Sequence, residues 1–394
     1  MTQSSPIKQS PGLLVLLASL VALGPLTVDM YLPALPGMVG NFATDTARVQ
    51  LTISSFLLGF ALFHLVCGPL ADRYGRKPIL IAGVALFIAA SFACAQAATI
   101  NELIMWRFVQ GIGACVGPTL GRAIARDVFG PMGAAKALAY IAMIMALAPA
   151  VAPTVGGLLL EWWTWSAIFY LLALYSLIAI IFVILKLPES LPVQQSLHPL
   201  KIARNYTELL HHRRFMATTC ASSLLYAGMI CFLSGSSFIF VDMMGVPTRY
   251  FGLLFLPTVA GYMAGNAFST RLIRGNKPEQ VMWLGARLAC AAAILMWAAN
   301  AWAPVPASII VPMALFSTSL GIMFPHAMAA ALRPFPHMAG TASALMGFIQ
   351  MGLSSVAGAL VGVLLIDSAA PMTYVIMATS GLSLLLIWRL LKTS

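Results

Sequence analysis

The chain has 394 residues, of which 60% are hydrophobic and only 8% are charged. Soluble globular domains carry about 25% charged residues, so this composition excludes a water-soluble protein and predicts a polytopic membrane protein. The net charge of +11 would suit a nucleic-acid partner. A nucleic-acid site, however, needs basic residues clustered on one face together with aromatic residues, and the sequence has no such cluster, so we expect no nucleic-acid partner.

Apolar runs separated by short polar segments predict twelve membrane-spanning helices, because a helix needs about 20 apolar residues to cross the hydrocarbon. We therefore expect an all-α fold. An even number of spans places both termini on the same side of the membrane. The expected spans are Gly12–Leu35, Val49–Ala71, Pro78–Ala98, Glu102–Ala123, Ala134–Leu160, Ser166–Leu187, Phe215–Val241, Tyr250–Leu272, Pro278–Asn300, Ser308–Leu332, Gly340–Ile366 and Met372–Leu391.

The basic residues predict which side of the membrane holds the termini. Of the 22 Lys and Arg, Arg48 and Arg249 fall on one face of this map, and Arg107 and Arg287 fall inside spans. All the others fall in the termini and in the loops or helix ends of the opposite face. Cytoplasmic loops carry an excess of Lys and Arg, so we expect both termini to be cytoplasmic. The first apolar run is too long for a signal peptide and is expected to remain as a helix.

The first span carries a single carboxylate, Asp29. A charge inside a lipid-spanning helix costs roughly 2.5–3.5 kcal/mol, and no other acid in the chain must lie within the hydrocarbon. One interpretation is that Asp29 is a proton site or a site for a substrate cation. The alternative is that Asp29 caps the helix end at the water interface.

The segment Gly68–Pro78, between the second and third spans, reads G-P-L-A-D-R-Y-G-R-K-P. It resembles the signature loop of the major facilitator superfamily. The resemblance implies a charge latch that holds two halves of the protein together in the outward-facing state, extended by charges at the end of helix four. The alternative is a basic loop that only orients the chain. The residues of the expected latch are Gly68, Asp72, Arg73, Gly75, Arg76, Arg126 and Asp127.

Helix four carries Arg107 in the pattern R-x-x-Q-G-x-G-A, which resembles a motif of proton-linked members of that superfamily. Asp29 lies 17 residues after Gly12, and Arg107 lies 5 residues after Glu102. At 1.5 Å per residue these depths are roughly 25 Å from one surface and roughly 7 Å from the other. In a core about 30 Å thick both residues lie in the outer third and can share one polar site. The alternative for Arg107 is snorkelling to the outer headgroups.

Helix five carries Pro149, Pro153, Gly156 and Gly157, which resemble the antiporter motif G-P-x-x-G-G, with Ala152 in place of one glycine. Paired prolines and glycines kink a helix and let a neighbouring helix pack closely. In the family this motif accompanies export. The alternative is an ordinary membrane helix, since Gly and Pro are common there.

The longest polar stretch, 188–214, divides the chain near its middle. We expect a cytoplasmic linker at 188–214 between a six-helix half at 1–187 and a second half at 215–394. Segment Arg271–Pro278 echoes Gly68–Pro78, because both are short basic turns that contain glycine and end in Lys-Pro. The echo indicates duplication, which many transporter folds show.

Further segments resemble the bicyclomycin- and chloramphenicol-resistance branch of the superfamily, the Bcr/CflA type. This resemblance implies a twelve-helix bundle of two pseudo-symmetric halves with a central cavity, drug–proton antiport, and a location in the bacterial inner membrane. It makes Asp29 the protonatable carboxylate and Arg107 its electrostatic partner. The segments that carry the resemblance are Asp29–Pro33, Gln110–Ala114, Gly321–Ala327 and Pro334–Ala344.

Other residues in the spans have weaker signals. Tyr31, Met143 and Tyr226 are candidates for an adaptable drug cavity, because methionine and aromatic side chains repack around varied ligands. His64 and His326 fit packing roles better than a proton relay. The six cysteines have no C-x-x-C spacing, so neither a disulfide framework nor a metal site is indicated.

These observations together predict a proton-coupled antiporter that exports small amphipathic drugs or metabolites by alternating access. We expect a monomer that needs no cofactor and uses the proton gradient, with the substrate, protons and the bilayer as partners. A proton-linked importer of a small nutrient with the same fold is the alternative. A membrane enzyme or receptor is disfavoured, because the sequence has no H-E-x-x-H, no G-x-S-x-G and no large cytoplasmic domain.

Overall fold

The computed structural model describes residues 11–191, 199–273, 277–365 and 368–393, and every regular element in these ranges is a helix. Twelve helical segments in them are long and apolar enough to cross a membrane. This confirms the all-α, twelve-span fold. The expected end of the eleventh span at Ile366 and residues 192–198 of the expected linker lie outside the described residues.

In the first half, the expected spans are recovered with small changes at their ends. The first span continues past Leu35 because η1 and α2 extend α1 beyond a turn. The end of the fourth span and the whole fifth span form one long helix, α6, that is kinked at Gly130, where φ is 65°. The elements are α1 (Pro11–Asp29), η1 (Leu32–Ala34), α2 (Leu35–Asn41), α3 (Thr46–Tyr74), α4 (Arg76–Ala95), α5 (Ile100–Ala114), α6 (Val116–Trp162) and α7 (Ser166–Lys186).

The second half begins with a helix that we did not predict, α8, which lies within the stretch expected to be a polar linker. The remaining elements follow the expected spans. They are α8 (Pro199–His211), α9 (Arg213–Ser237), the π-helical η2 (Phe238–Met243), α10 (Thr248–Phe251), η3 (Gly252–Phe255), α11 (Leu256–Leu272), α12 (Pro278–Trp302), α13 (Pro306–Leu332), η4 (Pro336–Met338), α14 (Ala339–Leu364) and α15 (Ala370–Thr393).

Local sequence sets several helix ends. The Asp45 side chain accepts a hydrogen bond from the Arg48 backbone N–H at 2.7 Å and so caps α3. Proline occupies the first position of α12 and α13, where its missing N–H leaves no helical hydrogen bond unmade.

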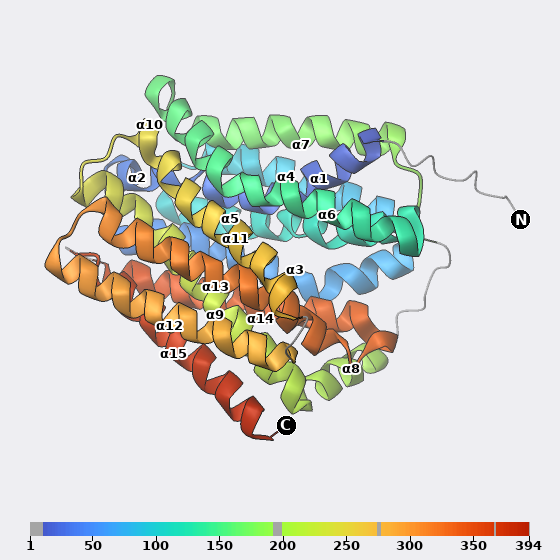
Figure 1. The fold of residues 1–394 in the computed structure, drawn as a ribbon. Helices are drawn as coiled ribbons and strands as arrows, with labels where there is room; N and C mark the ends of the chain where they lie inside the picture. Colours follow the sequence, from blue (N-terminus) through green and yellow to red (C-terminus); the bar gives the residue numbers. More distant parts are fainter. Residues whose placement is uncertain (1–10, 192–198, 274–276, 366–367, 394) are drawn as a thin grey trace, which may run out of the picture.

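The helices run between two ends of the bundle, which we name by the short elements found there (Figure 1). The α10 end carries α2 and α10, and the α8 end carries α8 and the C-terminus. In Figure 1, α12 and α15 slant away from α7 toward the α8 end. The two halves therefore lie closest together near the α10 end and spread toward the α8 end.

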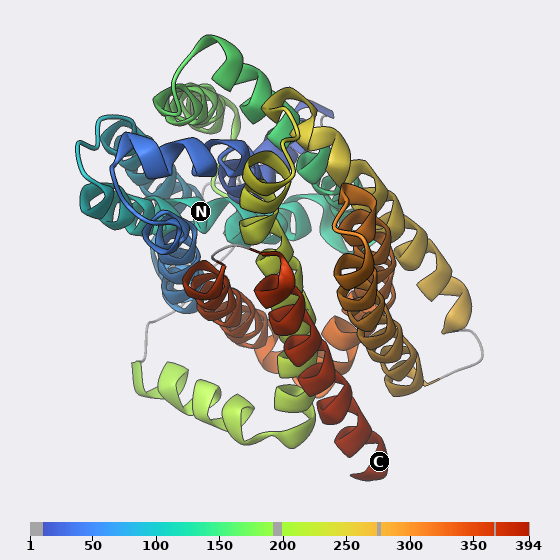
Figure 2. The ribbon, with the colours of Figure 1, turned by 90° about the vertical axis from the view of Figure 1, so that its left-hand side faces the viewer.

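The longest contact between the halves is made by α3 and α14, which pack along each other, as Figure 2 also shows. The Ser355 hydroxyl donates a hydrogen bond to the Ser54 carbonyl at 2.7 Å in this seam. Nearer the α8 end, the His64 ring lies directly against Gly347. These contacts hold the halves together along one side of the bundle.

The unpredicted helix α8 packs on α9 and α14 and also contacts α3 of the first half. The Tyr206 hydroxyl donates a hydrogen bond to the Leu65 carbonyl at 2.7 Å. Leu209 is fully buried in a small apolar cluster with Phe215 and Phe335. Part of the polypeptide between the halves thus packs against both of them.

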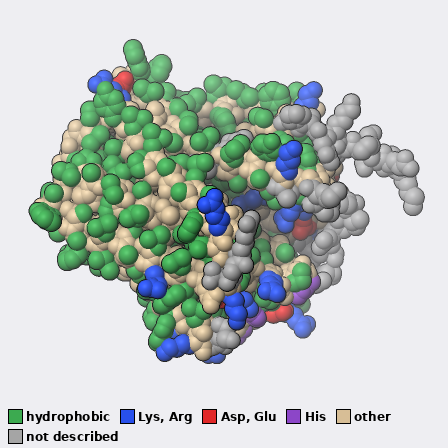
Figure 3. Space-filling model, in the orientation of Figure 1, with side chains coloured by type: hydrophobic (Ala, Val, Ile, Leu, Met, Phe, Trp, Pro, Cys, Tyr) green, Lys and Arg blue, Asp and Glu red, His purple; other side chains and the backbone are tan. Residues whose placement is uncertain are grey.

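The outer surface is mainly apolar along the length of the bundle (Figure 3). Large exposed side chains such as Leu185 and Trp302 lie on it, as expected for helices that face lipid. On the face shown in Figure 3, most of the basic side chains lie toward the α8 end. This arrangement matches a bilayer whose polar boundary crosses that end.

Candidate functional site

Arg107, on α5, is fully buried inside the first half. Its Nη1 donates a hydrogen bond to Gln110 Oε1 at 2.7 Å, and its Nε donates one to the Thr52 carbonyl at 3.4 Å. Its Nη2 has no hydrogen-bond partner among the described residues. The guanidinium therefore faces inward, and the alternative of snorkelling to the headgroups does not describe this structure.

Three aromatic rings surround the Arg107 guanidinium. Its Cζ lies 4.5 Å from the centroid of Phe56, 4.7 Å from that of Tyr31 and 5.7 Å from that of Phe169. A desolvated cation over ring faces gains roughly 2 kcal/mol. The cage thus offsets part of the cost of burying an arginine that has no ion pair within the described part of the chain.

Tyr31 belongs to this cage and not to an open cavity. Its side chain is fully buried, and its hydroxyl lies 2.9 Å from the Thr52 hydroxyl. The expectation that Tyr31 lines a drug cavity is therefore not met in this conformation. The reason is that η1 turns the ring back into the first half, against α3 and α7.

A short polar chain continues from Arg107 toward α4. The Gln110 side-chain N–H donates to the Ser91 hydroxyl at 2.8 Å, and Ser91 donates to the Phe87 carbonyl at 2.7 Å. Sequence analysis identified Gln110 within its motif but missed Ser91. No local signal marks Ser91, because the packing of α4 on α5 is what brings it to Gln110.

Asp29, the last residue of α1, is also buried, with only 3% of its surface exposed. No hydrogen bond or ion pair of its side chain is present within the described ranges. Asp29 lies close enough to Tyr226, on α9 of the other half, for the two side chains to interact electrostatically. The carboxyl is therefore buried within electrostatic range of the second half, and it does not cap the helix at an exposed end.

Asp29 and Arg107 do not form an ion pair among the described residues, although the membrane depths estimated from the sequence permitted one. Asp29 is the last residue of α1, and Tyr31 lies in the turn between α1 and η1. Tyr31, and not Asp29, contacts the Arg107 guanidinium. The two charged residues lie in one region of the bundle but are not in contact in this conformation.

The other two cavity candidates have different surroundings. Tyr226 is partly buried and packs edge-on against Phe324, with their ring centroids 5.9 Å apart. Met143, on α6, is 53% exposed. The structure brings Tyr226 near Asp29 but places Met143 on an exposed surface of α6.

The glycines of helix five lie at the α10 end and contact both halves. A side chain at Gly156 would collide with the Met30 carbonyl, next to Asp29, and one at Gly157 would collide with the Thr248 carbonyl of the second half. Gly252, at the start of η3, lies in the same way against Thr154 of α6. Glycine at these positions permits the close backbone approach that closes the α10 end. Pro149 and Pro153 precede the contact on α6.

Part of the expected latch is assembled at the α8 end, within the first half. Arg76 Nη2 lies 3.2 Å from Asp72 Oδ1, and Arg76 Nε donates to Asp127 Oδ2 at 2.8 Å. Arg73 instead stacks on Tyr74, and neither Arg73 nor Arg126 takes part in an ion pair within the described part of the chain. In this conformation the cluster joins α3, α4 and α6, and no ion pair of the described residues carries it across to the other half.

Glu189, which sequence analysis missed, completes this cluster. Its carboxylate accepts hydrogen bonds from the backbone N–H groups of Arg76 and Lys77 at 3.0 and 3.1 Å. Gly75 has a φ of 102°, and a side chain there would also collide with Glu189. No sequence pattern links Glu189 to a loop more than a hundred residues earlier.

Gly68 was expected to allow two helices to approach closely. A side chain at Gly68 would meet no atom within 4 Å, so the close approach is not made here. The physical reason is that the halves spread toward the α8 end. The same site would become crowded only if that end closed.

The two histidines singled out in the sequence lie apart from Asp29. His64 Nδ1 lies 3.3 Å from Cys115 Sγ, on the seam with α14. His326 is buried on α13. Arg287 is exposed on the surface of α12 and not inside the bundle. No group of three or more His, Cys, Asp or Glu in the described ranges is arranged to hold a metal ion.

The comparison with protein families gives one match, which covers residues 17–359, to the Major Facilitator Superfamily. The chain belongs to this superfamily. It is therefore a transporter and not an enzyme.

Curated relatives of similar length indicate which members of the superfamily the chain resembles. The chain is 29% identical over 381 residues to the bicyclomycin resistance protein homolog of Haemophilus influenzae, which covers 94% of this chain and 93% of that protein. It is 28% identical over 396 residues to multidrug resistance protein D of Escherichia coli, which covers 98% of this chain and 97% of that one. The predicted resemblance to the Bcr type of the superfamily is thereby confirmed.

Solved structures support the fold. A crystal structure of the nucleoside transporter NupG matches with a TM-score of 0.77 at 15% identity, covering 96% of this chain and 99% of that one. The peptide transporter POT in complex with alafosfalin matches with a TM-score of 0.77 at 14% identity, covering 99% of this chain and 95% of that one. At these identities the likeness shows the shared fold alone.

Proposed function

We propose that this superfamily member is a proton-coupled antiporter that exports small amphipathic drugs or metabolites across the bacterial inner membrane. The observation that carries the proposal is Asp29, a buried carboxyl without an ion pair among the described residues, within electrostatic range of Tyr226 in the second half. A buried carboxylate without a counter-ion is costly in its charged form. Such a group suits a role in which it gains and loses a proton as its surroundings change.

The positions of the basic residues support an inward-facing assignment for this conformation. The α8 end carries most of the Lys and Arg, which supports a cytoplasmic location for that end by the positive-inside rule. Gly156, Gly157 and Gly252 close the opposite end, while Gly68 faces open space. The halves 1–187 and 215–394 then rock about the seam of α3 and α14, with 188–214 as the cytoplasmic linker.

The transport cycle uses competition at Asp29. In the outward-facing state Asp29 takes up a proton and loses affinity for the substrate. In the inward-facing state substrate binding near Asp29 and Tyr226 favours release of the proton. One proton moving inward through 100 mV supplies about 2.3 kcal/mol, which supports a substrate gradient of about fifty-fold.

The names of the relatives favour export over the importer alternative. Two of them are described by bicyclomycin resistance and by multidrug resistance, and the glycine contacts of helix five belong to a motif that accompanies export in this family. Arg107 has a supporting role in this proposal, since its cage fixes Tyr31 and so fixes the direction of the end of α1.

Proton release from the purified protein tests the proposal. We expect wild type to release protons on addition of bicyclomycin or another amphipathic drug, and Asp29→Asn to release none. Asp242→Asn, which changes an exposed acid in η2, serves as the matched control and should behave like wild type. Equal release from Asp29→Asn and wild type would place the coupling carboxyl elsewhere. Drug binding to wild type without proton release would contradict antiport.

A further inference from the structure

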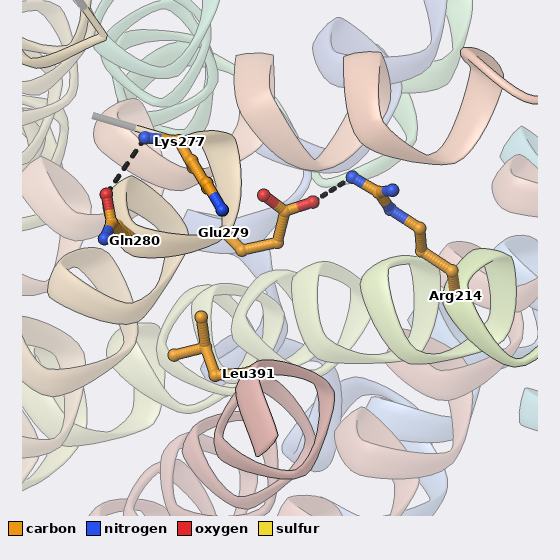
Figure 4. Close-up of a pocket in the computed structure, with 5 residues that line it drawn as sticks. All are labelled: Arg214, Lys277, Glu279, Gln280 and Leu391. Atoms are coloured by element: carbon orange, nitrogen blue, oxygen red, sulfur yellow. Dashed lines mark hydrogen bonds and ion pairs between the residues drawn. The ribbon is translucent and has the colours of Figure 1, made fainter. Parts of the chain in front are cut away.

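A pocket of about 400 Å³ lies at the α8 end of the second half, away from Asp29 (Figure 4). It is formed where the starts of α9 and α12 meet the end of α15. Its lining residues are Arg214, Lys277, Glu279, Gln280 and Leu391.

Arg214 and Glu279 form an ion pair across this pocket. Glu279 is only 6% exposed. The Arg214 side chain remains 40% exposed although its Nη2 pairs with Glu279, so the guanidinium is still accessible from the pocket that it lines. Planar guanidinium groups with free N–H donors are well suited to phosphate oxygens.

Lys277 adds a second cation at the mouth of the pocket. In Figure 4 its side chain extends toward Glu279, while its backbone N–H donates to Gln280 Oε1 at 3.0 Å. Two cations and one carboxylate leave the lining with one net positive charge. A single phosphodiester, which carries one negative charge, complements that balance.

The surrounding helices place this pocket at the boundary of the bilayer. Leu284 on α12 and Leu385 on α15 are exposed apolar side chains on the membrane surface. The Lys392 ammonium lies 3.8 Å from the ring centroid of Trp388. Tryptophan and lysine together are typical of the level of the lipid headgroups.

We propose that this pocket binds the headgroup of an anionic phospholipid of the phosphatidylglycerol class. The phosphate would lie between Arg214 and Lys277, and Leu391 would contact the apolar part of the lipid. Basic pockets between membrane helices on the cytoplasmic side are a known way to hold anionic headgroups. The lipid would join α9, α12 and α15 at their α8 ends.

The N-terminal half supplies a matched control for this site. Lys77 precedes Pro78 as Lys277 precedes Pro278, but the Lys77 ammonium donates to the Ile184 carbonyl at 2.9 Å. A Lys77→Gln variant therefore makes the same change on the same side of the membrane, in the other half of the protein. It should leave lipid binding at the pocket unchanged.

Native mass spectrometry of the full-length protein in detergent tests the proposal. The probes are dioleoyl-phosphatidylglycerol, dioleoyl-phosphatidylethanolamine and soluble glycerol 1-phosphate. A cationic residue near an anionic membrane contributes about 1 kcal/mol, so Lys277→Gln should weaken phosphatidylglycerol binding about fivefold and Lys277→Glu about thirtyfold. Thermal unfolding in the presence of the lipid provides a second measurement, since a ligand of the folded state raises the melting temperature.

The outcomes separate the possible occupants. Phosphatidylglycerol binding that Lys277→Glu weakens and Lys77→Gln does not supports the proposal. Equal binding by Lys277→Glu and wild type overturns it, and so does equal binding of the two lipids by wild type. Glycerol 1-phosphate that binds as tightly as the lipid would assign the pocket to a soluble organic phosphate and would also overturn it.

Discussion

Two glycines at opposite ends of the bundle predict opposite conformational traps. A side chain at Gly157 would collide with the Thr248 carbonyl, so the α10 end can close only with glycine there. A side chain at Gly68 meets open space in this conformation, but it would obstruct closure of the α8 end. Gly157→Leu should therefore favour the outward-facing state, and Gly68→Leu should favour the inward-facing state.

The size of the shift follows from the contacts. Forcing a large side chain into a packed contact costs typically 1–3 kcal/mol. That cost falls on only one of the two states, so it changes their population ratio by roughly 5- to 150-fold. If the free-energy difference between the two states of wild type is smaller than this cost, each variant populates mainly one state.

Distances between spin labels at the two ends measure this ratio. Labels at positions 45 and 303 report on the α10 end, and labels at 74 and 334 report on the α8 end, because these positions are exposed. The labels require a background in which the six native cysteines are replaced. Gly381, an exposed glycine on α15 whose Cβ would meet no atom within 4 Å, gives the control Gly381→Leu.

We expect Gly157→Leu to lengthen the 45–303 distance and shorten the 74–334 distance. Gly68→Leu should keep both at the values of this structure, even under an imposed proton gradient. The reasoning is refuted if the two variants shift the distances in the same direction, or if Gly381→Leu produces the same change as either.

Three further changes test other parts of the structure. Burial raises the pKa of Tyr206 to about 12. The buried, protonated side chain should therefore contribute stability below pH 10 that is lost as the pH rises through 12. Tyr206→Phe should remove this alkaline dependence of the melting temperature and speed opening along the seam. Gly75→Ala should lower the free energy of unfolding by about 1–3 kcal/mol, because it places a side chain at positive φ and against Glu189. Chemical denaturation that follows unfolding of the first half measures this loss of stability. Arg107→Lys should lower the free energy of unfolding by about 2 kcal/mol and reduce drug efflux from cells, because lysine lacks the planar guanidinium that stacks on the rings and donates hydrogen bonds. Unchanged efflux and melting temperature would show that the cage has no role.

Sequence alone determined the number and position of the membrane spans. Each span is a local property, because about 20 apolar residues suffice to cross the hydrocarbon. The structure moved the expected ends by only a few residues in most spans. The Gly68–Pro78 loop was also recognisable locally, since Asp72 and Arg76 are only four residues apart and pair across the turn at Gly75.

The partners of the buried charges were decided only by the tertiary structure. The rings around Arg107 come from Tyr31, in the turn between α1 and η1, and from α3 and α7. No pattern within α5 specifies which elements pack there. The depths of Asp29 and Arg107 were estimated from the rise of 1.5 Å per residue, but depth does not fix rotation about the helix axis. In the structure Tyr31, from the turn that follows α1, contacts the guanidinium, and Asp29 does not.

Whether each end of the bundle is open or closed was likewise decided only by the packing of the two halves. Gly68 and Gly157 both suggested close packing from sequence, yet only Gly157 makes such a contact here. Glu189 and Tyr206 lie in a polar stretch that sequence described only as a linker, and each contacts a residue more than a hundred positions away. Apolar length and short-range spacing are encoded locally, whereas these long-range contacts depend on how the halves are packed and tilted against each other.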